Sequence, residues 1–438
     1  MPLHGLRARP RNLLAAAGLQ LVLMAIAPAR ANNEADLAEE VAPESATTAP
    51  GAELDIQKRK VFPLLQPKLS GNFRTYDFAR DAEAQATQHT WAAGGWIGVE
   101  TPRSWDLVSA AATVYGSFPL KTTGATDPTL LLSPEADSLA VLGEAYLDLR
   151  RDALSARLYR QRLSAPYLND QDNRMIPNTF EAYAFGYAGE NVELGGGHVM
   201  RMKTRDSDEF DSMAEVAGAP SADTGATVIG AQRPPGSPFH LGAILVHNWD
   251  VISTFYTTGA WDWKRSETFD VRLAGQFTYQ RSVGEELIGS FDTTAAGLKA
   301  STGYRGGVLT LAGTITGAGA AIQSPFGQRP SYNSLMLFNF DRARERSWRI
   351  GFSNRLDWTG VEGLSFVLNY AQGEGARDPS TGADLPRRRE TDLTLDYRPK
   401  AGKLEGLWLR LRFADGRDGD DWLRELRVIL NYEVSMGR

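Results

Sequence analysis

Hydrophobic and polar residues alternate with a period of two along many short segments of the chain. In LWLRLRFA (407–414) the apolar residues occupy the odd positions, while Arg410 and Arg412 occupy even ones. Successive side chains of a β-strand point to opposite faces, so this spacing predicts a strand with one apolar face and one face that carries arginine. The same alternation recurs at 271–280, 348–358, 364–370, 391–397 and 427–434. Helical periodicity is scarce, so the sequence predicts an all-β fold.

Aromatic residues indicate which face of these strands meets which solvent. Trp348 and Trp358 bracket the apolar face of one segment, and Tyr370 and Tyr397 end two others. Transmembrane β-barrels place aromatic residues at both membrane interfaces, apolar residues toward lipid and polar residues toward the interior. The polar faces are rich in Arg, Asp, Asn, Ser and Gln, which suits a water-filled lumen. A soluble sandwich or lipocalin-like barrel shows the same alternation with apolar residues inside, so the assignment also depends on export and length.

The N-terminal region has the features of an export signal followed by a spacer. Arg7, Arg9 and Arg11 precede an apolar run at 13–27, and Ala29-Arg30-Ala31 matches a small-x-small cleavage pattern, which predicts a signal peptide at 1–31. The apolar run at 13–27 is shorter than the stretch of about 20 apolar residues that a membrane anchor would need, which favours a cleaved signal. Residues 32–57 lack Lys and Arg, so we expect an acidic disordered leader at 32–60. The remaining residues, 61–438, give about 18 strands at roughly 20 residues per strand and connection.

Composition excludes several classes of site. The 438 residues carry a formal net charge of −6 and contain no cysteine, so there is no disulfide framework, thiolate metal site or thiol nucleophile. No dominant basic excess suggests a nucleic-acid partner. The five histidines lack metal-ligand spacing, so we expect neither a metal nor another cofactor. His240 and His247 leave open a barrel enzyme with a serine-dependent hydrolase site.

Several segments together resemble a known family. RLYRQRLSAPYLNDQDNRMIPNTFEAYAFGY (157–187) is similar to its constriction-loop region, through Pro166, Asn169, Asp172, Arg174, Pro177, Thr179 and Phe180. Residues 69–81 resemble its first strand, 344–374 a later strand pair, and 390–417 with 423–434 its last three strands. The family is the OprD family of substrate-specific outer-membrane porins.

This resemblance implies an architecture and a set of substrate-binding residues. The implied fold is a transmembrane antiparallel β-barrel of about 18 strands with an inward-folded constriction loop. A ladder of basic residues on the wall would draw carboxylates through, opposite an electronegative pocket. The positions that match the ladder are Arg410, Arg412, Arg427 and Arg80, and those of the constriction segment are Arg160, Arg174 and Asp172.

Simpler interpretations exist for the same residues. The arginines could instead form ion pairs across strands, with Asp392, Asp396, Glu425 and Glu433 as candidate partners. The NDQDNR segment (169–174) also suits local turn chemistry, in which Asn and Asp bond their own backbone. RRRE (387–390) is most simply a solvated loop run that could attract anions at the mouth.

The sequence therefore predicts a porin for passive, selective uptake of small carboxylate-bearing solutes, without a covalent step. Its expected location is the outer membrane of a Gram-negative bacterium, in contact with outer-membrane lipid, as a monomer or a loose homotrimer. The alternatives are a barrel hydrolase, a structural barrel with a plugged lumen, and a soluble periplasmic β-protein.

Overall fold

The computed structural model describes residues 67–436 except positions 84, 221, 267, 400, 401 and 403. The predicted signal peptide (1–31) and acidic leader (32–60) lie outside the described residues. Among the described residues, none of the helices is long and apolar enough to cross a membrane.

Long antiparallel strands form the wall of the molecule. Their bounds are β1 Lys68–Ala82, β2 Gln85–Glu100, β3 Val108–Thr122, β4 Leu139–Arg151, β5 Leu154–Gln161, β8 Thr179–Ala188, β9 Glu193–Lys203, β11 Ala226–Gln232, β12 Phe239–Asn248, β13 Ile252–Ser266, β14 Phe269–Ser282, β15 Asp292–Tyr304, β16 Gly307–Thr316, β17 Arg346–Arg355, β18 Leu364–Glu374, β19 Arg388–Tyr397, β20 Leu407–Asp418 and β21 Asp421–Met436.

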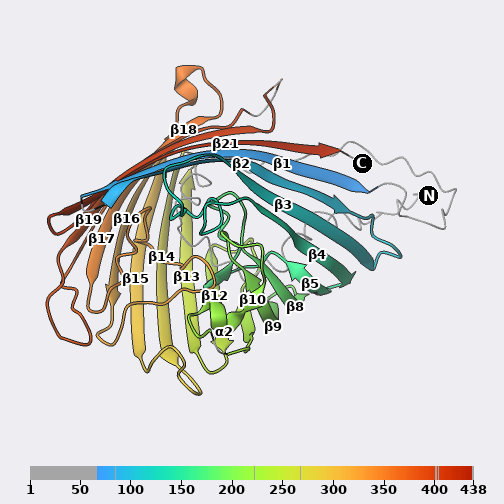
Figure 1. The fold of residues 1–438 in the computed structure, drawn as a ribbon, viewed down its shortest axis with the longest axis horizontal. Helices are drawn as coiled ribbons and strands as arrows, with labels where there is room; N and C mark the ends of the chain where they lie inside the picture. Colours follow the sequence, from blue (N-terminus) through green and yellow to red (C-terminus); the bar gives the residue numbers. More distant parts are fainter. Residues whose placement is uncertain are drawn as a thin grey trace, which may run out of the picture.

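The wall closes on itself. Each wall strand pairs with the next, and β1 also pairs with β21, from Leu69↔Met436 to Ala82↔Leu423. Figure 1 shows this closure where blue β1 runs beside red β21. The sheet has 19 strands, of which the two-residue β10 (Asp211–Ser212) pairs only with β9, so the barrel itself has 18. The predicted antiparallel barrel of about 18 strands is confirmed.

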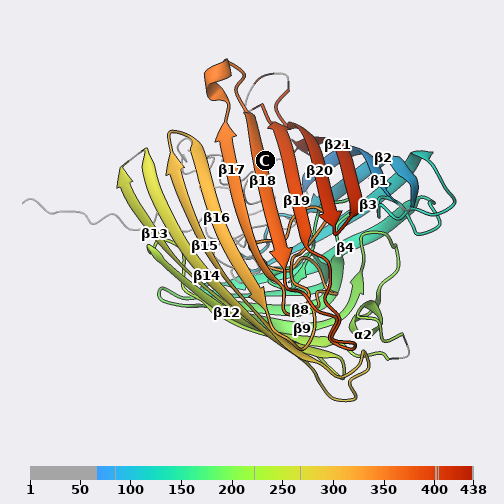
Figure 2. The ribbon, with the colours of Figure 1, turned by 90° about the vertical axis from the view of Figure 1, so that its left-hand side faces the viewer.

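The two ends of the barrel differ in the length of their connections. One end carries the segments 123–138, 162–178, 204–225 and 317–345, while the other has tight turns such as 152–153 and 305–306. Outer-membrane barrels have short periplasmic turns and longer extracellular loops, so the long segments mark the extracellular end. In Figure 2, α2 (Met213–Val216) and the orange η2 (Asp357–Thr359) lie at opposite ends.

Side chains on the wall face the directions that the alternation predicts. Leu409, Leu411 and Phe413 are 39–40% exposed on the outside, whereas Arg410 and Arg412 are buried on the inside. Two expectations were wrong in detail. The segment beginning at Trp348 ends as a strand at Arg355, so Trp358 lies in η2 instead. Residues 388–390 of the RRRE run begin β19, and therefore alternate between the two faces rather than forming a loop.

Long extracellular loops fold into the lumen. The loop at 162–178 contains a small hairpin, β6 (Ser164–Ala165) with β7 (Leu168–Asn169), and its Leu163 and Leu168 join a buried cluster with wall residues of β8 to β13. Tyr332 of the 317–345 loop contacts a row of wall alanines on β13, β14 and β16, which leave room for its ring. The predicted inward-folded constriction loop is therefore confirmed, together with a second inserted loop.

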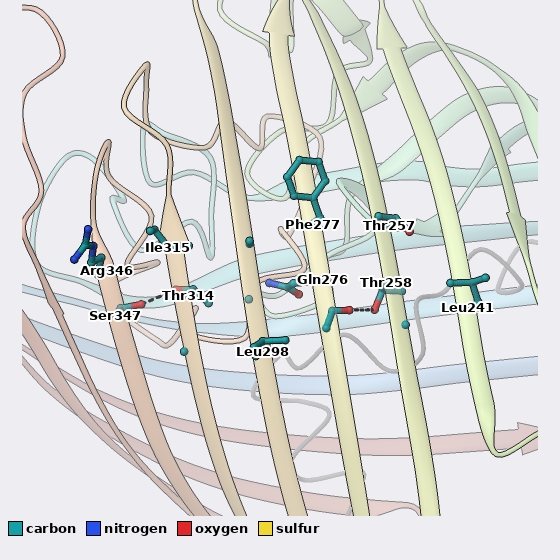
Figure 3. A pocket seen from close by; sticks show the side chains of 15 residues that line it. Leu241, Thr257, Thr258, Gln276, Phe277, Leu298, Thr314, Ile315, Arg346 and Ser347 are labelled. Carbon is teal, nitrogen blue, oxygen red and sulfur yellow. Dashed lines mark hydrogen bonds between the residues drawn. The ribbon is translucent and has the colours of Figure 1, made fainter.

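The outer wall carries a shallow apolar groove across β12 to β17, of about 660 Å³ (Figure 3). Its exposed side chains are Leu241, Phe277, Leu298 and Ile315, which lie on the lipid face. The neighbouring inward residue Thr314 forms a 2.6 Å hydrogen bond with Ser347. The groove therefore belongs to the membrane-facing surface and not to the path of a solute.

Candidate functional site

Several of the predicted arginines meet around one aromatic side chain on the inner wall. Phe78 of β1 is fully buried, and its ring centre lies 4.7 Å from the Arg427 guanidinium carbon on β21. Arg80 and Arg174 each approach the same ring at 5.4 Å. Arg412 of β20 lies directly across from Arg427 in the strand register. The face of an aromatic ring attracts cations, so Phe78 helps to hold three guanidinium groups together.

Acidic residues hold part of this group in place. Glu425 accepts hydrogen bonds from Arg427 Nε at 2.9 Å and from Arg80 Nε at 2.7 Å. Asp396 accepts two from Arg410, at 2.7 and 3.0 Å, in the bidentate geometry that favours arginine. The alternative interpretation as cross-strand ion pairs therefore describes Arg80 with Glu425 and Arg410 with Asp396, whereas Arg427 pairs with Glu425 within β21. Their charges are nevertheless on the lumenal side of the wall.

Arg412 differs from its neighbours in its contacts. Its Nε donates to the Thr394 hydroxyl at 3.3 Å, a neutral acceptor, and the adjacent residue across the strand is the cationic Arg427. Like charges opposite each other on one sheet face repel. Arg412 and Arg427 therefore place two cationic side chains directly opposite each other on the lumenal face.

The constriction loop brings further positive charge to the same wall. Arg174 Nε donates to the Thr129 carbonyl at 2.8 Å. Burial and the neighbouring Arg427 lower the pKa of Arg174 to about 10. Arg205, which donates to Asn173, has its pKa lowered to about 9 by burial and by Arg174. The charged form of each arginine is disfavoured by the neighbouring cations, so an anion bound among them would stabilise all of their charges. No signal in the sequence pointed to Arg205.

Asp172 lies on the loop at the edge of this group. Arg74 of β1 donates to Asp172 at 2.7 Å and to Asn431 at 2.6 Å, and it also bonds the Arg174 carbonyl. Burial alone would raise the pKa of Asp172, but Arg74 and Arg162 outweigh burial and lower it. Arg74 was not among the predicted site residues, although a period of two places it on the same strand face as Arg80.

A second acidic residue of the loop has the opposite behaviour. Arg162 Nε donates to Asp170 at 2.7 Å, yet burial raises the pKa of Asp170 above its usual range. The Arg162 side chain is 34% exposed, more than the other ion-paired residues of the constriction loop. Asp170, Asp172 and Arg162 therefore form the mixed-charge face of the constriction.

Arg160 lies apart from the main group. It donates to Glu181 at 3.0 Å and to the Leu142 carbonyl at 3.1 Å, and its guanidinium stacks on Phe210 at 4.1 Å. The structure thus brings together Arg80, Arg174, Arg412 and Arg427, places Arg410 and Asp172 at the edges, and separates Arg160.

Buried carboxylates on the wall anchor the second inserted loop. The backbone amides of Leu337 and Phe338 donate to Glu390 at 2.7 and 2.8 Å. The Met336 amide donates to Asp392 at 3.3 Å. Asp392, which was a candidate arginine partner, therefore fixes a loop.

Neither candidate histidine has a hydrogen bond to a serine among the described residues, which a serine-dependent hydrolase site requires. His240 bonds Asp262 at 2.8 Å, and His247 packs edge-on against Trp249 at 4.7 Å between ring centres. Within the described ranges, no group of three or more potential ligands could hold a metal ion.

Comparison with known families agrees with this architecture. The model of the outer membrane porin, OprD family, matches residues 67–436. The chain belongs to the OprD family. Porin D of Pseudomonas aeruginosa is 28% identical over 122 residues, which cover 24% of this chain and 27% of Porin D. The family consists of porins and not enzymes, which decides against the barrel hydrolase, and it places the chain in the outer membrane of a Gram-negative bacterium.

Solved structures of low sequence identity share the fold. Pseudomonas aeruginosa OpdK, determined with vanillate, has a TM-score of 0.77 at 22% identity, covering 84% of this chain and 99% of OpdK. Pseudomonas aeruginosa OccK9 (OpdG) has a TM-score of 0.77 at 21% identity, covering 85% and 100%. Acinetobacter baumannii OccAB1 has a TM-score of 0.75 at 16% identity, covering 84% and 97%.

Proposed function

We propose that this OprD-family chain conducts small carboxylate-bearing solutes passively through its lumen. The observation that carries the proposal is the cationic group of the inner wall, in which Arg412, Arg427 and Arg174 converge from two strands and the constriction loop. Arginine remains charged and presents a planar fork that fits a carboxylate in a bidentate manner.

The acids beside the arginines make the binding weak enough for release. Conduction needs attraction into the pore without deep trapping. Glu425 partly neutralises Arg427 and Arg80, while Arg412 lies directly opposite the cationic Arg427. A carboxylate would bind first where repulsion between cations is greatest, at Arg412 and Arg174, and would then pass along the mixed-charge loop face.

A related structure supports the proposed class of solute. OpdK was determined with vanillate, an aromatic carboxylate. Phe78 and the arginines around it offer the combination of ring and cation that an aromatic carboxylate can use. We therefore propose aromatic carboxylates as the first solutes to test.

The test is planar-bilayer conductance of the purified protein, with vanillate and with neutral vanillyl alcohol added in turn. Discrete conducting steps that vanillate blocks and vanillyl alcohol does not would support a carboxylate channel. Equal block by both would indicate a size sieve. Absence of conductance from folded protein would favour a structural barrel with a plugged lumen.

A further inference from the structure

The outer face of the barrel carries a row of aligned polar and aromatic residues near its extracellular end. Successive cross-strand partners in this row are Trp348, Gln372, Arg389, Arg417 and Trp422, from β17 to β21. Glu390, which follows Arg389, is fully buried on the inner face. Gly416, which precedes Arg417, lies against the lumenal Phe338. Arg389 and Arg417 therefore point outward.

Arg389 and Arg417 face each other directly across β19 and β20. Like charges in directly opposite positions destabilise a sheet. Among the described residues, no carboxylate forms an ion pair with either guanidinium group. Arg417 donates one weak hydrogen bond, 3.4 Å long, to the Asp420 carbonyl, and none is described for the Arg389 guanidinium.

Nearby outward acids already have partners. Asp415, two residues from Arg417 on the same face, accepts from Arg424 at 2.5 Å. Glu374 lies 3.1 Å from Arg387. Elsewhere on the same rim, Arg281 of β14 stands opposite the acidic Asp292 of β15. The pair at 389 and 417 is thus a cationic site to which the described residues of the sheet supply no ion-paired carboxylate.

An apolar stripe lies toward the middle of the membrane from this cationic pair, beyond one row that contains Thr391, Asp415 and Arg424. Two rows down from Arg389 and Arg417 are Leu393 and Phe413, with Leu426 beside them on β21. These side chains are 37%, 40% and 45% exposed, respectively. A ligand that matches this surface has an anionic head at the height of the arginines and a hydrocarbon tail below it.

We propose that Arg389 and Arg417 bind a phosphate-bearing lipid of the outer leaflet. The phosphate lies between the two guanidinium groups, which fit its oxygens in a bidentate manner. The acyl chain lies along Leu393, Phe413 and Leu426, and the tryptophans at the ends of the row occupy the interface, as aromatic girdles do. The site is on the outside of the barrel, so it does not depend on the proposed selectivity of the lumen.

The experiment is native mass spectrometry of the detergent-purified protein titrated with lipid A, a phosphorylated glycolipid. The wild type is expected to retain lipid A, while the double variant Arg389→Gln with Arg417→Gln binds at least tenfold more weakly. The charge-preserving variant Arg389→Lys with Arg417→Lys is expected to retain part of the binding. Arg281→Gln is the matched control, because it removes an outward arginine from the same rim, and it should bind as the wild type does.

Two further ligands distinguish the source of the affinity. Dephosphorylated lipid A should bind the wild type and the double Gln variant equally weakly, and inorganic phosphate should not compete with lipid A at equal concentration. The proposal is overturned if the double Gln variant retains lipid A as the wild type does, or if Arg281→Gln loses it to the same extent. Circular dichroism of each variant verifies that the barrel is folded, and absence of conductance or of carboxylate block in the wild type would concern only the lumen.

Discussion

Asn169 and Gln328 join the two inserted loops by a reciprocal pair of hydrogen bonds. Asn169 Nδ2 donates to the Gln328 carbonyl at 2.8 Å, and the Gln328 amide donates to Asn169 Oδ1 at 2.8 Å. The Asn169 amide also donates to the Phe326 carbonyl at 3.0 Å. Gly327 lies between these contacts at φ +131°, where an added Cβ would lie 2.6 Å from the Asn169 carbonyl oxygen. The two loops therefore act as one constriction.

Asn169→Ala is expected to widen the pore and reduce its selectivity. The substitution removes both side-chain bonds between the loops, each worth about 0.5–1.5 kcal/mol. We expect a larger single-channel conductance and a smaller difference between carboxylate and neutral solute. The matched control is Asn339→Ala, whose 2.6 Å bond to Ser334 lies within one loop. Unchanged conductance in Asn169→Ala would show that the loops hold their positions independently.

Arg410→Ala combined with Arg412→Ala is expected to lower carboxylate uptake more than uptake of neutral solutes of the same size. The two single variants should differ, because Arg410 is bound to Asp396 in a bidentate pair whereas Arg412 lies directly opposite the cationic Arg427. We expect Arg412→Ala to account for most of the loss, roughly tenfold in carboxylate block, equivalent to about 1.4 kcal/mol. Liposome uptake assays measure both. An equal loss for charged and neutral solutes would contradict a role in selectivity.

Acidification is expected to increase the preference of the channel for anions. The pKa of Asp170 is raised and that of Asp172 is lowered, so Asp170 takes up a proton first as the pH falls toward the carboxyl range near 4. Arg162 then loses a partner, and the constriction gains positive charge. Reversal potentials in a salt gradient, measured between pH 7 and pH 4, report this change. Asp170→Asn should show the acid-form selectivity already at pH 7 and respond less to pH.

The same two shifts have opposite effects on stability. A raised pKa means that the folded state binds the Asp170 proton more readily than the unfolded state, so its contribution to stability grows as the pH falls. The ion pairs of Asp172 contribute stability above its usual pKa, and this is lost as the pH falls through its lowered value. Thermal unfolding of Asp172→Asn should therefore differ most from the wild type at neutral pH and least in strong acid.

Glu390→Ala is expected to release the loop at 317–345. The substitution leaves the partly buried amides of Leu337 and Phe338 without their acceptor, at a cost on the order of 1–3 kcal/mol for each group at most. We expect faster cleavage of the loop by added protease and a lower Tm. Glu405→Ala, at an exposed turn, is the control and should leave both unchanged. Protection of the loop equal to that of the wild type would show that its apolar contacts alone suffice.

The direction of each side chain on a strand was predictable from sequence, because the pleat imposes a period of two. Leu409 and Arg410 therefore lie on the expected faces. The end of a strand depends on tertiary contacts that the period does not encode, so Trp358 was placed on a strand that stops at Arg355. The charged composition of the RRRE run (387–390) indicated a loop. Residues 388–390 instead begin β19, so their side chains point alternately toward the lumen and the membrane.

The partners of the site residues were beyond the reach of sequence. Arg74 and Asp172 are 98 positions apart, and they meet only because a loop folds back onto the first strand. The family resemblance indicated which arginines line the wall, but it did not indicate which carboxylates pair with them. Of the four candidate acids, Asp396 and Glu425 form the described pairs with these arginines. Their cross-strand pairs with Arg410 and Arg80 follow from the register between neighbouring strands, which no short segment determines.

Closure of the barrel by β1 and β21 has a consequence for how the protein is made. Arg74 and Asn431, which bond across this seam, are 357 positions apart. Contacts between such distant positions form slowly, since the entropy of closing the chain is lost before the contact is gained. The first strand must therefore wait, with one edge unpaired, until the whole chain has been exported. During that interval the unpaired edge of β1 can pair with other chains and aggregate, so assembly of the barrel depends on a partner that covers this edge.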